Sequence, residues 1–411
     1  MTLFPPCSLV LVFSRLFSYR TIMSSSSNKN VFNPAKVLIV AKTTRYDMEK
    51  RLAGSMSDGA MENMLNRRGT NVNRLIRKHH EHKDFLQHLK QLLEKRNVDT
   101  RVVERFEYTE ECANWADAVF AAGGDGTFLL AASKVTTRNK AVIGFNTDPE
   151  GSEGHMCLLR KAPMNEVESA LNHLFEGDFE WLYRTRIRIS MNCEGGVGES
   201  IPLHDSAMNR EPSTTRWDQR ESRRRKRWTS PRGERRTEEL PVLSLNEVFV
   251  GESLSSRVSY FELSLDHSPF IKQKNSGLTV CTGSGSTSWY FNINKLTPHS
   301  VSQVLSLAAK YGLEKASPSS DVIERICQDF NEQLMFAPDL NKMAFCIRDP
   351  IFNSTFPPSE SRGFAHVIKV RSRGYDSHLV VDGGISFQFN DGAEAELRVN
   401  DEDSLRTVIF R

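Results

Sequence analysis

Residues 116–130 read Ala-Asp-Ala-Val-Phe-Ala-Ala-Gly-Gly-Asp-Gly-Thr-Phe-Leu-Leu, and this stretch decides the fold of the first half of the chain. The apolar part, residues 116–122, is typical of a buried strand in a parallel sheet. The glycines that follow predict a tight turn, and residues 128–135 predict the start of a helix. A strand that passes through glycines into a helix is the repeating unit of a doubly wound α/β domain.

The segments on either side of this stretch continue the same alternation. Continuous apolar runs predict three further strands, at residues 36–41, 98–104 and 141–145. Residues 83–96 have the spacing of an amphipathic helix, whereas residues 46–82 are polar and mixed. We therefore expect an α/β domain over residues 34–180.

The pattern changes after about residue 180. Short alternating or β-branched runs separated by turn residues follow, at residues 186–191, 245–251, 260–265, 278–281, 366–371, 378–381, 385–389 and 395–399. This spacing predicts a mainly β domain, a sandwich or a barrel-like fold, over residues 181–411. One helical stretch, residues 301–336, interrupts it.

An arginine-rich segment does not fit this pattern. Residues 205–239 contain almost no aliphatic side chain and include the run Arg-Arg-Arg-Lys-Arg at 223–227. We expect a disordered insertion between two strands, because such a composition cannot bury a core. A nuclear-localisation or RNA-binding segment is the alternative.

The amino terminus, residues 1–33, has a separate character. No acidic residue precedes Asp47, Arg15 and Arg20 lie among apolar residues, and four serines follow at 24–27. This composition is typical of a mitochondrial transit peptide, so we expect the protein in the mitochondrion, in the matrix. A secretory signal and an uncleaved disordered tail are the alternatives.

The overall composition excludes several classes of protein. The net charge of +3 is too small to indicate a nucleic-acid partner, and no apolar run reaches the roughly 18 residues of a membrane span. The seven cysteines are scattered and form no C-x-x-C pair, which argues against disulfides and structural zinc. The histidines at 79, 80, 82 and 88 are interpreted as part of a solvated helix end or loop, and no metal ligands are predicted.

The glycine turn carries the first candidate site. Gly123, Gly124, Gly126 and Thr127 would let backbone N–H groups and the helix amino terminus approach a phosphate. The lysine of a P-loop is absent. Asp125 could orient a substrate hydroxyl and accept its proton during phosphoryl transfer. The alternative is a tight turn in which Asp125 caps the helix.

This turn resembles the catalytic motif of the phosphofructokinase-like superfamily, which includes NAD kinases, diacylglycerol kinases and sphingosine kinases. Two other motifs resemble NAD kinases in particular. Asn246-Glu247 resembles the Asn-Glu pair that contacts NAD in that family, and residues 282–289 resemble its glycine- and threonine-rich loop. In that loop Ser284 and Thr287 align with contact positions.

Three positions bear on the kind of NAD kinase. Asn146 matches a family asparagine beside the NAD site, but Asp148 stands where the family has glycine. Ser276 stands where many members have an aspartate that contacts the dinucleotide. These departures, with the transit-like start, resemble the mitochondrial members of the family in animals.

The resemblance implies ATP-dependent phosphorylation of the adenosine ribose 2′-hydroxyl of NAD. It also implies a divalent cation that accompanies ATP, and a homodimer. Two other functions stay open, a lipid kinase of the same superfamily and a non-catalytic dinucleotide sensor. The sequence does not distinguish NAD from NADH as substrate, or ATP from polyphosphate as donor.

Overall fold

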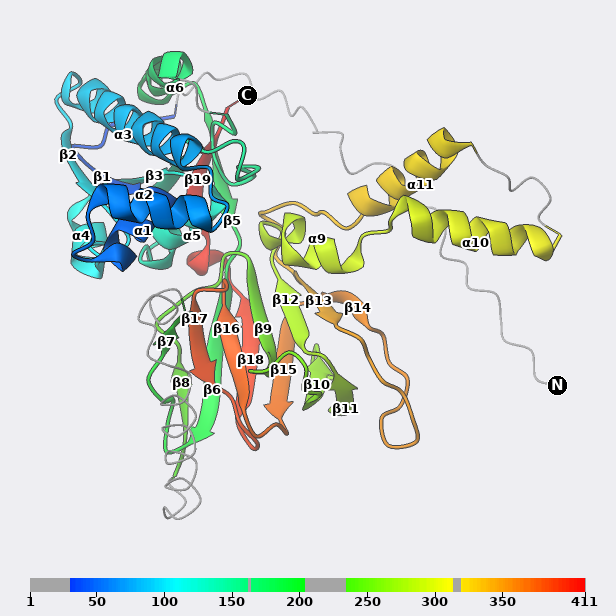
Figure 1. The fold of residues 1–411 in the computed structure, drawn as a ribbon. Helices are drawn as coiled ribbons and strands as arrows, with labels where there is room; N and C mark the ends of the chain where they lie inside the picture. Colours follow the sequence, from blue (N-terminus) through cyan, green and yellow to red (C-terminus); the bar gives the residue numbers. More distant parts are fainter. Residues whose placement is uncertain (1–29, 162–163, 204–233, 313–318, 411) are drawn as a thin grey trace, which may run out of the picture.

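The computed structural model describes residues 30–161, 164–203, 234–312 and 319–410. An α/β domain stands above a two-sheet β domain, and a helical arm projects to one side (Figure 1). The predicted fold class, an α/β domain followed by a mainly β domain, is confirmed. Most of the predicted transit peptide (residues 1–29) and of the arginine-rich insertion (residues 204–233) lies outside the described residues.

The first sheet forms the centre of the α/β domain, in the strand order β2-β1-β3-β4-β19-β5. Its strands are β1 (Lys36–Ala41), β2 (Asp99–Val103), β3 (Ala118–Ala122), β4 (Ala141–Phe145), β5 (Glu180–Arg184) and β19 (Leu405–Ile409). Strands β1 to β4 pair in parallel, and β3 and β4 are buried along their whole length, as their apolar sequences predict. Strand β19 brings the end of the chain back into this sheet, where it runs antiparallel to β5.

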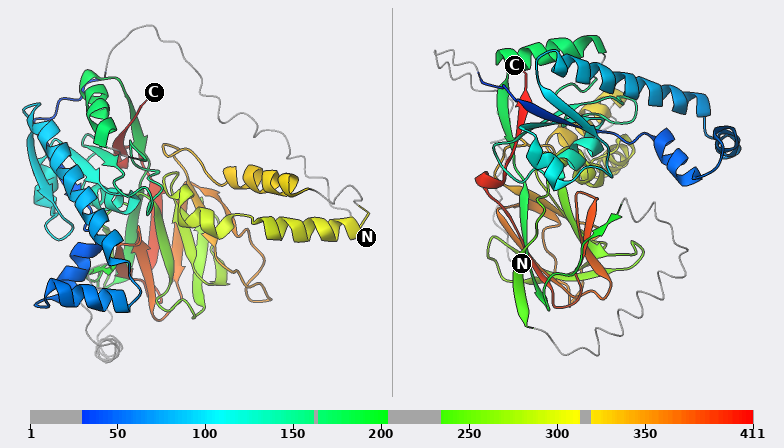
Figure 2. Two further views of the ribbon diagram at one scale, coloured as in Figure 1. Left: turned by 45° about the horizontal axis from the view of Figure 1, so that its top comes forward. Right: turned by 90° about the vertical axis from the view of Figure 1, so that its left-hand side faces the viewer.

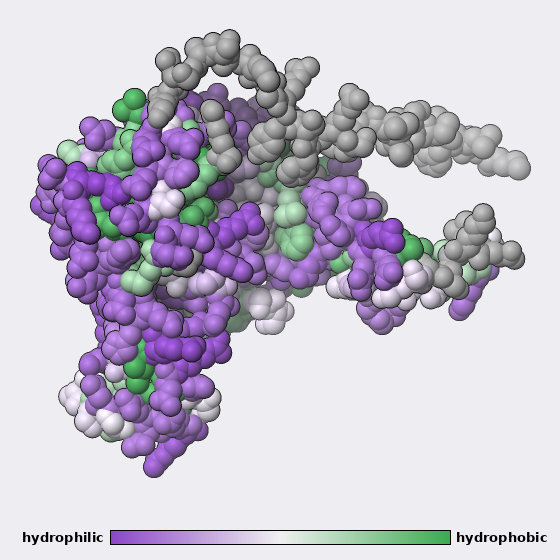
Figure 3. All heavy atoms as spheres, turned by 90° about the horizontal axis from the view of Figure 1, so that it is seen from above, coloured by the Kyte–Doolittle hydropathy of each residue, from purple (hydrophilic) through white to green (hydrophobic). Residues whose placement is uncertain are grey.

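Helices cover both faces of the first sheet. They are α3 (Val72–Glu94), α4 (Glu110–Trp115), α5 (Asp125–Ser133) and α6 (Met164–Glu176), while α1 (Arg45–Ala53) and α2 (Asp58–Arg67) pack on α3. Side chains of α3 and α6 share one apolar cluster with the sheet, and those of α4 and α5 share another. The outer surface on the α3 and α6 side is mainly hydrophilic (Figure 3).

The polar segment 46–82 is more regular than its composition indicates. It holds α1, α2 and the first part of α3, which begins at Val72 rather than at residue 83. The side chains of Thr44, Ser57 and Asn71 accept backbone N–H groups at the three helix starts. These caps satisfy donors that the helices leave unpaired, so short polar helices become stable once α3 packs on the sheet.

Two antiparallel sheets form the β domain, with the strand orders β11-β10-β15-β18-β6-β8 and β14-β13-β12-β9-β16-β17-β7. The strands of the first are β6 (Ile187–Glu194), β8 (Arg235–Glu239), β10 (Ser259–Leu265), β11 (Ile271–Asn275), β15 (Val367–Ser372) and β18 (Glu394–Val399). Those of the second are β7 (Ile201–Pro202), β9 (Glu247–Glu252), β12 (Leu278–Cys281), β13 (Met343–Ile347), β14 (Arg362–Ala365), β16 (Ser377–Val381) and β17 (Ile385–Gln388). The two sheets face each other (Figure 2), and one apolar core joins their facing sides.

Several ends of the predicted segments have a different structure from the one expected. Phe32, in the segment predicted to be unstructured, is buried and stacks near Phe120 at a centroid distance of 6.3 Å. Strand β8, in the segment predicted as an insertion, pairs with β6. These contacts join residues far apart in sequence, so local composition could not indicate them.

The predicted helical stretch 301–336 is two helices. Beyond η1 (Gly285–Thr287) and α9 (Trp289–Asn294), helices α10 (Pro298–Lys310) and α11 (Ser320–Glu332) pack on each other and form the projecting arm (Figure 1). No helix in the described ranges is long and apolar enough to span a bilayer.

Candidate active site

The glycine turn connects β3 to α5, at the edge where the parallel strands end. A Cβ on Gly123 would lie 2.3 Å from Thr127 Oγ1, and one on Gly124 would lie 2.4 Å from Ser152 Cβ. A Cβ on Gly126 would meet no atom within 4 Å. The first two glycines are therefore required for packing, and the third leaves open space at the amino terminus of α5, where an anion is favoured.

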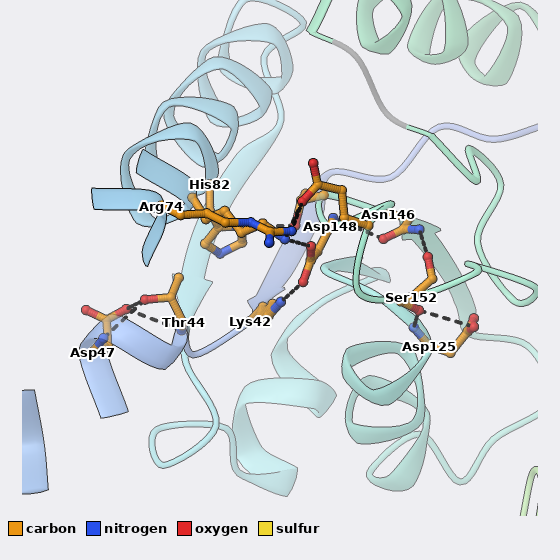
Figure 4. Close-up of polar contacts among 12 residues, drawn as sticks. Lys42, Thr44, Asp47, Arg74, His82, Asp125, Asn146, Asp148 and Ser152 are labelled. Carbon is orange, nitrogen blue, oxygen red and sulfur yellow. Dashed lines mark hydrogen bonds and ion pairs between the residues drawn. The ribbon is translucent and has the colours of Figure 1, made fainter. Parts of the chain in front are cut away.

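The Asp125 carboxylate is held by the loop that follows β4 (Figure 4). Its Oδ1 accepts the Met156 N–H at 2.9 Å, and its Oδ2 accepts the His155 N–H at 3.2 Å and the Ser152 hydroxyl at 3.4 Å. Gly124 occupies the N-cap position of α5, and Asp125 is the first residue of the helix. The structure thus favours an oriented carboxylate over the alternative of a helix cap.

Asn146 holds this loop in place. Its side chain is fully buried, donates to the carbonyls of Ser152 (2.9 Å) and Arg160 (2.7 Å), and accepts the Asp148 N–H at 3.1 Å. The amide therefore fixes the turn that carries both Asp148 and Ser152. Its predicted contact with NAD stays a prediction.

Asn246 and Glu247 lie at the start of β9, and a single aspartate clamps their backbone. The buried carboxylate of Asp382 accepts the N–H groups of Leu245 (2.9 Å), Asn246 (2.8 Å) and Glu247 (3.1 Å). It also accepts the Ser244 hydroxyl at 2.7 Å. The sequence predicts Asp382 only as a turn residue between strands. Its positive φ of 48° agrees with the turn, but its clamping role requires the fold.

Two polar atoms of this pair are buried without a partner. Among the described residues, neither Asn246 Oδ1 nor Glu247 Oε2 has a hydrogen-bond partner. Burial, and then the charge of Asp382, raise the pKa of Glu247 to about 8. A buried acceptor without a donor costs free energy, so it commonly indicates a bound group that supplies the donor. Ribose hydroxyls are donors of this kind.

The loop 282–289 packs directly on Asn246. The Thr282 N–H donates to the Asn246 carbonyl at 3.0 Å, and a Cβ on Gly285 would lie 2.2 Å from the same oxygen. The Thr287 hydroxyl donates to the Ser284 carbonyl at 3.3 Å. The structure therefore brings together the two motifs that resemble NAD kinases.

Arg184, at the end of β5, connects the two halves of the site. It is buried, and its Nη1 donates to the Ser284 hydroxyl at 3.1 Å. Burial lowers its pKa to about 10, while the negative charge of Asp125 opposes that shift. Sequence reasoning missed Arg184, although an arginine that directly follows an aromatic and apolar run is a signal worth testing.

The histidines of α3 do not form a metal site with other ligands. Among the residues that the structure describes, no group of three His, Cys, Asp or Glu side chains could hold a metal ion. They belong to a helix interior rather than to the predicted helix end or loop, and His82 is buried against Thr147. All cysteines in the described ranges are free thiols.

The chain is similar to several known proteins. The ATP-NAD kinase N-terminal domain matches residues 37–179. The Rattus norvegicus protein named NAD kinase 2, mitochondrial, is 43% identical over 385 residues, which cover 92% of this chain and 88% of that protein. Its Homo sapiens namesake is 42% identical over 385 residues, which cover 92% of this chain and 85% of that protein.

Among solved structures, yeast NADH kinase complexed with NADH aligns with a TM-score of 0.49 at 12% identity, over 94% of this chain and 85% of that chain. The mammalian relatives are much closer in sequence, and their identity extends over almost the whole chain. This chain therefore belongs to the NAD kinase family, and within it to the mitochondrial NAD kinases.

Proposed function

We propose that the protein transfers the γ-phosphoryl group of MgATP to the 2′-hydroxyl of the adenosine ribose of NAD, which yields NADP. One observation carries this proposal. Arg184 donates to Ser284, in a loop that packs on two buried acceptors without partners among the described residues, and its guanidinium feels the charge of the oriented carboxylate Asp125. The Asp125 carboxylate can accept a proton, and the buried acceptors of Asn246 and Glu247 can bind the hydroxyl groups of a nucleoside.

The proposed reaction is a single in-line displacement. The ribose 2′-oxygen bonds to the γ-phosphorus as the bond from that phosphorus to the bridging oxygen breaks, and ADP leaves with the electron pair. Asp125 orients the hydroxyl and takes its proton. The N–H groups at the start of α5, around Gly124 and Gly126, stabilise phosphate oxygens. The divalent cation enters with the triphosphate as part of the substrate.

The two domains contribute different halves of this site. We propose that residues 34–180 bind the donor and that residues 181–411 bind NAD. Asn246 and Glu247 would accept hydroxyls of the adenosine ribose, and Ser284 and Thr287 would bind beside them. Asn146 would contribute through the loop that it holds.

The proposal also covers the location and the assembly of the protein. We propose that residues 1–33 direct the chain to the mitochondrial matrix, as the names of the mammalian relatives suggest. We also propose a homodimer. The arm exposes large apolar side chains that a second copy could cover, among them Val304 (64% exposed), Leu307 (54%) and Tyr311 (87%).

One assay tests the proposed function and separates its rivals. Protein from about Asn30 onward is incubated with MgATP and NAD, and NADP is measured with an NADP-specific dehydrogenase. The expected result is NADP formation that Asp125→Asn abolishes. Phosphorylation of diacylglycerol without NADP would instead indicate a lipid kinase, and NAD binding without turnover would indicate a sensor.

A further inference from the structure

A cavity of about 680 Å³ lies between α3 and the ends of β1 and β4, beside the glycine turn. Basic side chains predominate in its lining: Lys42, Arg45, Arg68, Arg74 and Lys78 face it, with the acidic Glu81, Asp148 and Glu150. The Lys42 N–H donates to the carbonyl of Ala122 at 2.9 Å, one residue before the glycines. The cavity therefore adjoins the glycine turn, but its lining residues are not those of the turn itself.

Two lysines in this cavity share the carboxylate of Asp148, and Figure 4 shows the contact that Lys42 makes with it. Lys42 Nζ lies 2.5 Å from Asp148 Oδ2, and Lys78 Nζ lies 2.9 Å from Asp148 Oδ1. Lys78 also lies 3.0 Å from Glu150, which Arg74 contacts at 2.7 Å. The loop after β4 thus places two carboxylates on a cluster of three cations.

The Asp148 carboxylate stays ionised at neutral pH. Burial alone would raise the pKa of Asp148, but hydrogen bonds from Lys42 and Lys78 lower it to about 2. Asp148 is therefore an anion whose two oxygens each bind one ammonium group. Two oxygens of a phosphate chain present the same arrangement to a pair of lysines.

The same short turn connects this anion to Asp125. The Asp148 carbonyl accepts the N–H groups of Gly151 and Ser152, both at 3.0 Å. The Ser152 hydroxyl in turn accepts the Asp125 N–H at 3.0 Å. A change at the Asp148 side chain would thus reach the catalytic carboxylate through four residues of one turn.

We propose that Lys42 and Lys78 bind the phosphate chain of the nucleoside triphosphate donor, and that Asp148 fills their site when the donor is absent. This inference rests on the proposed function and assigns its donor subsite. When the donor binds, its phosphates replace the Asp148 carboxylate on the two lysines. Asp148 then sets the donor affinity by competition.

The proposal predicts opposite effects for two variants. Lys78→Met removes one cation at nearly constant length, so the donor should bind about tenfold more weakly. Asp148→Asn removes the competing anion, so the donor should bind about three- to tenfold more tightly. Arg77→Met is the matched control, because Arg77 precedes Lys78 on α3, is exposed, and does not line the cavity.

The test is calorimetric titration of the four proteins with MgATP and, separately, with inorganic tripolyphosphate, both without NAD. The thermal midpoint of each variant shows that it is folded, and a tighter-binding Asp148→Asn cannot result from misfolding. Equal affinity for tripolyphosphate and MgATP would assign the site to the phosphate chain alone, and tighter MgATP would add a contribution from the nucleoside.

Wild-type affinity for both ligands in Lys78→Met and in Asp148→Asn would overturn the proposal. The proposed function is judged separately, because these titrations need no NAD and no turnover. A protein that binds tripolyphosphate through Lys78 and forms no NADP would contradict the proposed reaction while it supports the donor subsite.

Discussion

The two carboxylates of the candidate site, Asp125 and Glu247, are held in opposite ways. Asp125 accepts three hydrogen bonds from one loop, whereas Glu247 Oε2 is buried and has no partner among the described residues. The first carboxylate is oriented before any ligand arrives. Glu247 pays a desolvation free energy for its unpaired oxygen, and a ligand that donates a hydrogen bond to that oxygen recovers it as binding free energy.

The supports of the two carboxylates differ for the same reason. Ser152, His155 and Met156 donate directly to the Asp125 side chain, because that side chain must be aimed. Asp382 instead accepts the backbone N–H groups of residues 245–247, and it makes no hydrogen bond to the Glu247 side chain. A group that acts on one proton is thus fixed by its own hydrogen bonds, and a group that binds is presented by its backbone.

The largest expected effect is on turnover, when the oriented carboxylate Asp125 is replaced. Asp125→Asn removes the proton acceptor and turns an amide toward two backbone N–H donors. We expect turnover to fall about a thousandfold, with NAD affinity within a factor of about three of the wild type. Steady-state NADP formation and NAD titration measure the two quantities. Ser152→Ala, which removes the 3.4 Å contact with the carboxylate and the 3.0 Å hydrogen bond from the Asp125 N–H but keeps the proton acceptor, should cost far less. Equal losses in both variants would mean that Asp125 acts only through its loop.

The next largest effect is on stability and NAD binding, when Asp382, which holds the backbone of Asn246 and Glu247, is replaced. Asp382→Asn replaces one acceptor oxygen with an amide that meets N–H donors, so the free energy of unfolding should fall by about 3 kcal/mol. Urea denaturation measures this loss, and NAD affinity should fall with it. Asp266→Asn is the control, since Asp266 accepts the His366 and Val367 N–H groups at an exposed turn remote from the site. If Asp382→Asn bound NAD normally, the clamp would not position the pair.

A pH experiment sharpens the contrast at Glu247. Its pKa of about 8 lies above the ordinary 4.5, so between these values the folded protein keeps a proton that the unfolded chain has lost. Stability should therefore fall as pH rises from 4.5 to 8, by up to about 1.4 kcal/mol per pH unit. Glu247→Gln cannot ionise, so it should be more stable than the wild type at pH 8 and equal to it at pH 4.

The same variant tests binding by Glu247. An ionised carboxylate accepts two hydroxyls, and glutamine offers only one acceptor oxygen. We expect Glu247→Gln to bind NAD about tenfold more weakly at pH 8. Thermal unfolding across pH, with NAD titration at pH 8, gives both results. A stability difference that did not change with pH would contradict the raised pKa.

The smallest expected effect separates the glycines of the turn. A methyl group on Gly126 meets no atom within 4 Å, and alanine is the better helix former, so Gly126→Ala should stabilise the fold by about 0.5–1 kcal/mol. It should still raise the KM for ATP, because the methyl occupies the space where phosphate is proposed. Gly124→Ala should instead lower the thermal midpoint through its clash with Ser152. An unchanged KM in a stable Gly126→Ala protein would place the phosphates elsewhere.

Much of the α/β framework follows from the sequence. Strands β1 and β4 begin and end where their apolar runs do, because a strand buried on both faces must be apolar throughout. The glycine turn and the Asn246-Glu247 pair are also visible in sequence, since each motif consists of adjacent residues. Family membership followed from these local motifs.

The sequence by itself determined which residue types could carry the chemistry; only the tertiary structure decided how they are held and joined. Arg184, Asp382 and the Lys78–Asp148 pair act across the fold, through partners that lie 70 to more than 130 positions away. Strand β19 likewise joins the first sheet from the far end of the chain. Local pattern reports what a residue can do, whereas burial and hydrogen bonding depend on neighbours that only the folded chain supplies.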